Sequence, residues 1–137
     1  MVVIRCPLIV GGVMTQRVVE QWFEPDLSSA AGVRRFVRAA TEQLALDEGP
    51  LVLMASELAS NAICHAGTRF CVRVIEDGHH VRVEVIDESP TELRVRRSDL
   101  TSDNGRGLSI VGVLAADWGV EPLPGGKRVW FETGSRP

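Results

Sequence analysis

Two runs of alternating side chains in the middle of the sequence constrain the fold more than any other feature. In residues 69–76 and again in 81–87, valine or phenylalanine alternates with cysteine, arginine or glutamate. A period of two is typical of strands that bury one face of a sheet. Asp77-Gly78 stands between the runs and is a turn pair common in two-residue hairpins. The sequence therefore predicts an antiparallel hairpin whose apolar face needs a covering layer.

Two amphipathic segments precede the hairpin and supply such a layer. The first runs over 28–46, with Asp26 or Ser28 as its N-terminal cap. Residues 47–50 (DEGP) are expected to break it, and a second helix is expected over 51–65. The side chains expected to face the sheet are Val33, Phe36, Val37, Ala40 and Leu44 in the first helix and Leu51, Ala55, Leu58 and Ala62 in the second.

The remaining elements complete the predicted order. Residues 17–23 are expected to form a strand, and 88–104 a long polar loop. A helix is expected over 105–117, followed by strands over 118–122 and 127–133. This order predicts an α+β fold: a two-layer sandwich of a mixed, mostly antiparallel sheet that helices cover on one face.

Composition excludes several classes of protein. The 137 residues are one domain's length, and a net charge of −3 lacks the basic footprint of direct nucleic-acid binding. The apolar stretches are far shorter than the roughly 20 residues of a membrane span. Three cysteines leave one unpaired in any disulfide scheme, which is typical of the reduced cytoplasm.

The N-terminal segment is expected to be flexible or loosely attached over 1–16, with the domain over 17–137. Arg5 and Pro7 interrupt its apolar run, which disfavours a signal peptide. Met14 is an alternative start of the natural chain.

Three polar residues at steps of four share one side of the second predicted helix: Glu57, Asn61 and His65. One interpretation is a polar stripe that faces solvent, since burying such groups without partners is unfavourable. The other is metal binding. A carboxylate and an amide oxygen suit Mg²⁺, which often works together with substrate phosphates.

Two further features fit a nucleotide, though each has a plainer explanation. Asp87 ends a predicted strand, where its carboxylate either accepts from the amino group of a base or closes an Asx turn. Gly105-Arg106-Gly107-Leu108 opens a predicted helix, where free N–H groups face an anion or the chain simply turns.

In this order and spacing, the segments resemble those of the GHKL ATP-binding family. ELASNAICHAG (57–67) resembles its N-box, VIDES (85–89) its first glycine box, and DNGRGLSIVGVLAADWGV (103–120) its second. GGKRVWFE (125–132) resembles its closing strand. The resemblance covers 17–133, is greatest to stand-alone actinobacterial members similar to anti-sigma-factor serine kinases, and implies the Bergerat-type ATP-binding fold.

The resemblance implies ATP and Mg²⁺ as ligands. It makes Asn61 the Mg²⁺ ligand at the phosphates, Glu57 the general base and Asp87 the acceptor for the adenine amino group. The nucleotide-binding residues that it implies are Asn61, His65, Asp87, Ser89, Gly105, Arg106, Gly107, Leu108 and Arg128. Two of these depart from the family pattern: Ser89-Pro90 replaces glycines, and Arg128 stands where a threonine is common.

The function implied is that of an ATP-binding regulator. It would be a serine/threonine kinase of the anti-sigma-factor type, which phosphorylates an anti-sigma antagonist protein and sequesters a sigma factor. Relatives dimerise through the sheet, which implies a homodimer in which Trp22 and Phe23 take part, although core packing explains these two residues as well.

Two alternatives remain open at this stage. The first is a non-catalytic protein-interaction module with weak or lost nucleotide binding, favoured by Ser89-Pro90 and Arg128. The second is a metal site, although its spacing fits no zinc motif of CxxC type. Its ligands would be Cys64, His65, Cys71, His79 and His80.

Overall fold

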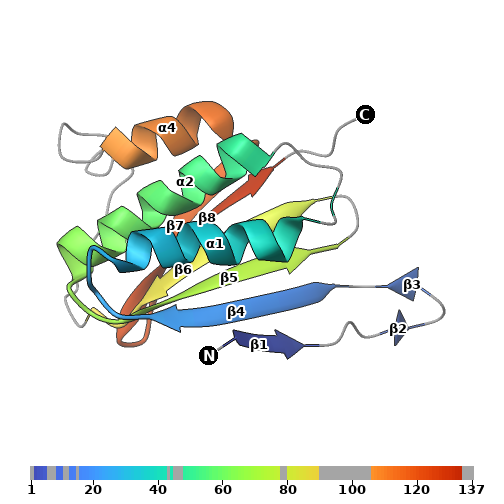
Figure 1. The fold of residues 1–137 in the computed structure, drawn as a ribbon, viewed down its shortest axis with the longest axis horizontal. Coiled ribbons are helices and arrows are strands. Elements are labelled where there is room, and N and C mark those ends of the chain that lie inside the picture. The colour runs from blue at the N-terminus through green and yellow to red at the C-terminus, as the bar shows by residue number, and fades with distance from the viewer. Residues whose placement is uncertain are drawn as a thin grey trace.

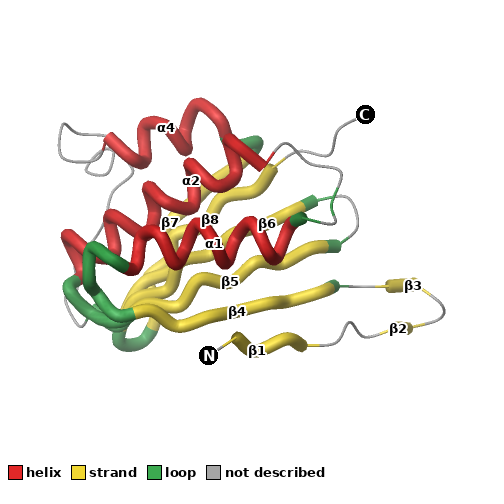
Figure 2. Tube along the Cα trace, viewed as in Figure 1, coloured by secondary structure: helices red, strands yellow, loops and turns green. Residues whose placement is uncertain are grey.

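The protein is built of two layers (Figure 1). The computed structural model describes residues 2–5, 9–10, 13–14, 16–42, 44, 48–77, 80–89 and 106–133. In these residues, three α-helices and one π-helical turn lie on one face of a six-stranded sheet (Figure 2). The α+β sandwich expected from the sequence is confirmed.

The sheet runs in the order β1-β4-β5-β6-β8-β7. Its strands are β1 (Val2–Arg5), β4 (Arg17–Phe23), β5 (Phe70–Glu76), β6 (Val81–Asp87), β7 (Asp117–Leu123) and β8 (Gly126–Thr133). A separate short ribbon pairs β2 (Ile9–Val10) with β3 (Val13–Met14). The helices are α1 (Ser29–Thr41), α2 (Glu48–Asn61), the π-helix η1 (Ala62–Ala66) and α4 (Arg106–Leu114).

Every described pairing within the sheet is antiparallel, so the expectation of a mixed sheet was wrong. The connections explain this. Two consecutive helices join β4 to β5 and return the chain in the opposite direction. The single helix α4 joins β6 to β7, which therefore run the same way, but β8 lies between them and pairs with both.

The central hairpin forms as its alternation predicts. Val72 of β5 lies opposite Val85 of β6, and Val74 opposite Val83. Their face of the sheet is buried under the helices, and Phe70 and Phe131 are fully enclosed there. Burying a side chain of that size contributes about 1.5–3 kcal/mol.

The helices present the predicted apolar faces to this sheet. All the side chains named for the two helices are buried except Leu44, which is partly buried and packs against the core. Helix α2 lies between α1 and α4, with contacts to both. It therefore buries further positions that its spacing did not mark: Val52, Met54 and Ala59.

Helix bounds differ from the predicted ones where local hydrogen bonds decide. Helix α1 ends at Thr41 and not near residue 46, because the Leu44 N–H turns back to the Thr41 carbonyl at 3.0 Å. Helix α2 begins at Glu48, so residues 48–50 belong to this helix and do not interrupt helical structure as expected. Pro50 fits the first helical turn, where its missing N–H has no partner to lose.

The end of the second helix is wider than an α-helix. Its last turn, η1, is π-helical and stops at Gly67, as the sequence predicts for this exit. Gly67 has φ +65° and donates its N–H to the Ala62 carbonyl at 3.1 Å. A side chain at this position would be strained.

The later elements and the N-terminus also differ from expectation. Helix α4 ends at Leu114, three residues before the predicted end. It stops there because β7 already begins at Asp117, where pairing with β8 sets Trp118 opposite Phe131. At the other end of the chain, β1 pairs with β4 over its full length. Residues 2–5 of the segment expected to be loosely attached thus form an edge strand, in which β-branched residues favour pairing.

The two aromatic residues at the end of β4 have separate surroundings. Phe23 is buried in the core, with ring centroids 5.6 Å from Phe70 and 6.2 Å from Phe36. Trp22 is on the opposite face and is 39% exposed, with the Arg69 guanidinium 4.4 Å from its ring centre. Core packing therefore accounts for Phe23.

The sheet face away from the helices carries a network of arginine and glutamate side chains. Its centre is Glu84, whose side chain is only 5% exposed. The Glu84 carboxylate lies 3.0 Å from a guanidinium nitrogen of Arg82 and 3.5 Å from one each of Arg73 and Arg128. The three arginines shield the carboxylate from water and bind the strands β5, β6 and β8 to one another.

Close packing on this face also requires a glycine. The Arg82 guanidinium lies 4.0 Å from the ring centre of Trp130, and that ring lies over Gly119 of β7. A Cβ at Gly119 would be 2.8 Å from the ring, so a larger residue would displace the tryptophan.

Glu84→Gln should lower the free energy of unfolding by about 2–3 kcal/mol. Three guanidinium groups would lose the carboxylate that they share in a setting with little water. Urea unfolding measures the loss. The control is Glu132→Gln, since Glu132 is 35% exposed at the rim and its pair with Arg82 is worth less than about 1 kcal/mol. Equal losses in the two variants would contradict the central role of Glu84.

Cys71 provides a test at alkaline pH. Burial, reinforced by the charge of Glu20, raises the pKa of the Cys71 thiol to about 11. Between the ordinary thiol pKa and 11, the unfolded chain loses this proton and the folded chain keeps it, so stability falls as pH rises. We expect a loss on the order of 2 kcal/mol from pH 8.5 to 11.

The measurement is urea unfolding as a function of pH with Cys6 and Cys64 replaced by serine. The same protein carrying Cys71→Ala is the control. The chain contains no tyrosine and one lysine, so few other groups titrate in this range. Identical pH profiles for the two proteins would mean that Cys71 is not buried as described.

Candidate functional site

Glu57 and Asn61 lie on the flank of α2 that faces away from α1. The side toward α1 is marked by Ser56, whose hydroxyl accepts from the Arg34 guanidinium at 3.3 Å. At 100° per residue, Glu57 and Asn61 fall on the other flank of the helix. Helix α4 packs against α2 on the side opposite α1 (Figure 1). Glu57 and Asn61 are both partly buried. They are therefore not a freely solvated stripe.

Asn61 carries a polar atom that the described residues leave unsatisfied. Its amide nitrogen Nδ2 is buried and, among these residues, has no hydrogen-bond partner. A buried donor without a partner is unfavourable by about 1–3 kcal/mol. Such groups are retained where a ligand or ordered water completes them.

His65 differs from the other two members of the predicted stripe. It lies in η1, and its side chain is exposed. Hydrogen bonds in a π-helix span five residues, so the four-residue step from Asn61 no longer keeps strict α-helical register. The sequence gives no clear signal for this change of helix type.

Asp87 lies at the end of β6 on the helix-covered face, in the row of Val83 and Val85. Its side chain is 2% exposed. Oδ1 accepts the Ser89 N–H at 3.0 Å, which is the Asx turn that the sequence allowed. Helix α2 and the turn η1 both contact β6, so this carboxylate belongs to the same layer interface as the helix that carries Asn61.

Lys127 is the partner of Asp87, and no sequence motif predicted this pairing. Its Nζ lies 3.3 Å from Asp87 Oδ2, and the two residues are direct neighbours in the β6–β8 register. A signal was present in β8, since Lys127 alternates in step with the buried Val129 and Phe131. That period of two places it on the inner face.

Arg128 does not join the other candidate residues. It lies on the outer face of the sheet, where it contacts Glu84 at 3.5 Å and Glu121 at 2.9 Å. The residue of β8 that contacts Asp87 is therefore Lys127 and not Arg128. Gly126 fixes this geometry, because a Cβ there would collide with the Asp87 carbonyl oxygen.

The glycine-rich segment is described only in part. Arg106, Gly107 and Leu108 form the first turn of α4, as expected for a helix start. Gly105 and Pro90 lie outside the described residues, as does His79. Helix α4 packs on α2, and this brings its first turn into the same layer as Glu57 and Asn61.

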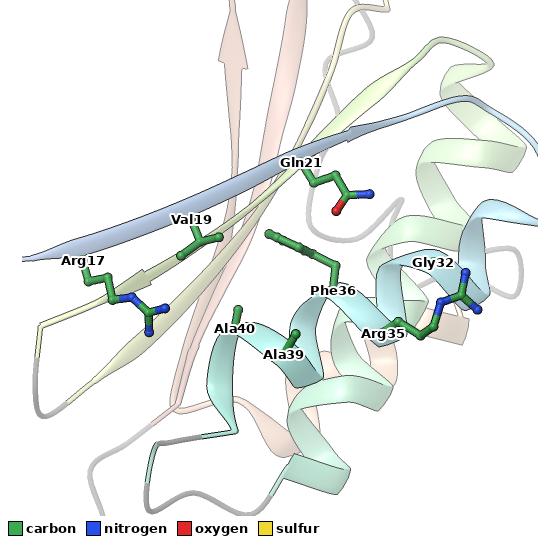
Figure 3. A pocket seen from close by; sticks show the side chains of 8 residues that line it. All are labelled: Arg17, Val19, Gln21, Gly32, Arg35, Phe36, Ala39 and Ala40. Carbon is green, nitrogen blue, oxygen red and sulfur yellow. The ribbon is translucent and has the colours of Figure 1, made fainter. Parts of the chain in front are cut away.

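A separate hollow of about 360 Å³ lies between α1 and β4. Figure 3 shows Arg17, Gln21 and Arg35 around an apolar floor that includes Phe36. None of the residues proposed for the nucleotide lines it. Its position against α1 separates it from the flank of α2 that carries Glu57 and Asn61.

The donor set fits Mg²⁺ only in company with a ligand. Glu57 and Asn61 offer a carboxylate and an amide oxygen, which are ligand types that Mg²⁺ prefers. In the part of the chain that the structure describes, His, Cys, Asp and Glu form no group of three or more able to hold a metal ion. Phosphate oxygens of a substrate would have to complete the coordination.

Comparisons with known proteins place the chain by its fold. Neither the models of known protein families nor the curated proteins give a match. Among solved structures, the crystal structure of the RsbU and RsbW domains of Rv1364c from Mycobacterium tuberculosis matches with a TM-score of 0.63 and 20% sequence identity. The two share a fold. The match covers 86% of this chain and 33% of that one, so this protein corresponds to a third of the longer chain.

The length and apolar character of the helices can be compared with those of a membrane span. None of those in the described residues has both the length and the apolar character needed to cross a bilayer.

Proposed function

We propose that the protein is an ATP-binding regulator that acts as a serine kinase of the anti-sigma-factor type. The observation that carries the proposal is the unsatisfied amide of Asn61 beside Glu57, on the α2 flank next to α4. The fold shared with the RsbU and RsbW structure and the resemblance to GHKL motifs both support it.

Each residue has a distinct task in this proposal. The Asp87 carboxylate accepts a hydrogen bond from the adenine amino group, and the N–H groups at the start of α4 bind phosphate. The Asn61 oxygen is a ligand for Mg²⁺, which when bound neutralises charge on the phosphates. Ser89 borders the adenine side, and His65 and Arg106 border the phosphates.

Glu57 is the proposed general base. Its carboxylate takes the proton from a serine hydroxyl as that oxygen forms a bond to the γ-phosphorus. The bond from this phosphorus to the β–γ bridging oxygen breaks, and ADP leaves. The products are a phosphoserine on the partner, ADP and a protonated Glu57, which returns the proton to solvent.

The proposed partners follow from the same family resemblance. The phosphorylated serine would belong to an anti-sigma antagonist protein, and the second partner would be a sigma factor that the kinase sequesters. Neither is assigned a surface by the described residues. The proposed location is the cytoplasm.

One contact favours a second candidate function. Both oxygens of the Asp87 carboxylate already have partners within the chain, Lys127 at 3.3 Å and the Ser89 N–H at 3.0 Å, and this makes the carboxylate a weaker acceptor for a base. A protein-interaction module on the same fold, with weak nucleotide binding, would be consistent with this pairing.

Nucleotide binding is the first test of the proposal. We expect Mg·ATP to bind and Mg·GTP to bind at least about tenfold more weakly, because guanine presents a carbonyl oxygen where a carboxylate needs a donor. Calorimetric titration of protein stripped of carried-over nucleotide measures both constants. Equal affinities would remove Asp87 from the base-binding site, and binding of neither nucleotide would favour the interaction module.

Glu57→Gln tests catalysis apart from binding. The amide keeps the size of the side chain but is a poor base, so phosphoryl transfer to a serine acceptor should fall by about 10²-fold or more. Affinity for Mg·ATP should stay within about threefold of the native value, which excludes a general loss of structure. An unchanged transfer rate would show that Glu57 is not the base.

A further inference from the structure

The Asp87 carboxylate meets two donors from its own chain. Lys127 contacts Oδ2 and the Ser89 N–H contacts Oδ1, and the side chain is 2% exposed. The ammonium brings a full positive charge to a setting with little water, whereas the amino group of a base is a neutral donor. A full opposite charge attracts a carboxylate more strongly than a neutral donor does at the same distance. A base therefore competes with Lys127 at a disadvantage.

The backbone holds Lys127 in this competing position. Lys127 and Asp87 are paired in the β6–β8 register, and the strands approach closely here because Gly126 has no Cβ to collide with the Asp87 carbonyl oxygen. The lysine side chain is itself 20% exposed. Its four-carbon stem is flexible, so the ammonium has a route to solvent without movement of the strand.

From this arrangement we propose that Lys127 determines access to Asp87, and that the base of a nucleotide binds only when the ammonium leaves the carboxylate. The inference rests on the proposed nucleotide-binding function and adds to it a built-in competitor. The single lysine of the chain thus sets the affinity for purine bases that offer an amino group.

Adenosine is the probe, because it carries the base without phosphates and so does not respond to the net charge of the protein. Lys127→Thr should bind adenosine at least tenfold more tightly than the native protein at pH 8. Lys127→Arg keeps a cation at Asp87 and should remain within threefold of native. Arg38→Thr removes an exposed charge from α1 and should also match the native protein. Thermal unfolding of each variant verifies that it is folded.

A measurement on the native protein avoids dependence on the threonine variant. Because the chain has one lysine, lysine labelled with ¹³C and ¹⁵N gives NMR signals from Lys127 alone. Saturating adenosine should shift the Lys127 side-chain signals toward those of a solvated ammonium. ATP should produce the same shift.

The outcomes separate this inference from the function on which it rests. Tighter adenosine binding by Lys127→Thr together with the native-protein shift supports the proposal. If adenosine or ATP binds the native protein without moving the Lys127 signals, or if Lys127→Thr folds and binds as the native protein does, the inference is overturned and the nucleotide site stands. If no protein in the series binds adenosine or ATP, the proposed function fails and the inference fails with it.

Discussion

The apolar face of the sheet has to be kept from water across its whole width, and this constraint arranges the other elements. Helix α2 lies over the middle of that face, with α1 and α4 on its two sides. A helix in this position buries most of its circumference, as Met54 and Ala59 show. Polar residues on it are consequently held at helix–helix seams. Asn61 is partly buried for this reason, and its unsatisfied amide is a direct result.

On the other face of the same sheet, side chains and not helices keep a charged group from water. No helix of the described residues covers it, yet Glu84 is almost as buried as a core residue because arginines from three strands lie around it. The inner and outer faces therefore use different chemistry at successive positions of one strand. In β8, Lys127 contacts the inner carboxylate of Asp87 and Arg128 the outer one of Glu84. A one-residue error in assigning the face exchanges the two roles.

Much of the fold could be predicted from periodicity alone. The hairpin of Val72 and Val85 and the exit at Gly67 follow from alternation and glycine chemistry. Helix ends and the π-helical turn could not be predicted, because they depend on hydrogen bonds such as that from Leu44 to Thr41. For the candidate site, spacing marked Glu57 and Asn61, but the partner of Asp87 lies on a neighbouring strand that is far away in sequence. The inward direction of Lys127 was encoded in its alternation with Val129.

The position of the Asp87–Lys127 pair has a consequence for the order of folding. The hairpins β5–β6 and β7–β8 each join strands that are adjacent in the chain, whereas β6 and β8 meet only when the two hairpins dock. Contacts between residues close in sequence form first, since a contact between distant residues requires a long loop to close. We therefore expect the pair to form late, so that weakening it should speed unfolding more than it slows folding. The ion pair thus joins the two hairpins through the same lysine that we propose as a competitor of the nucleotide base.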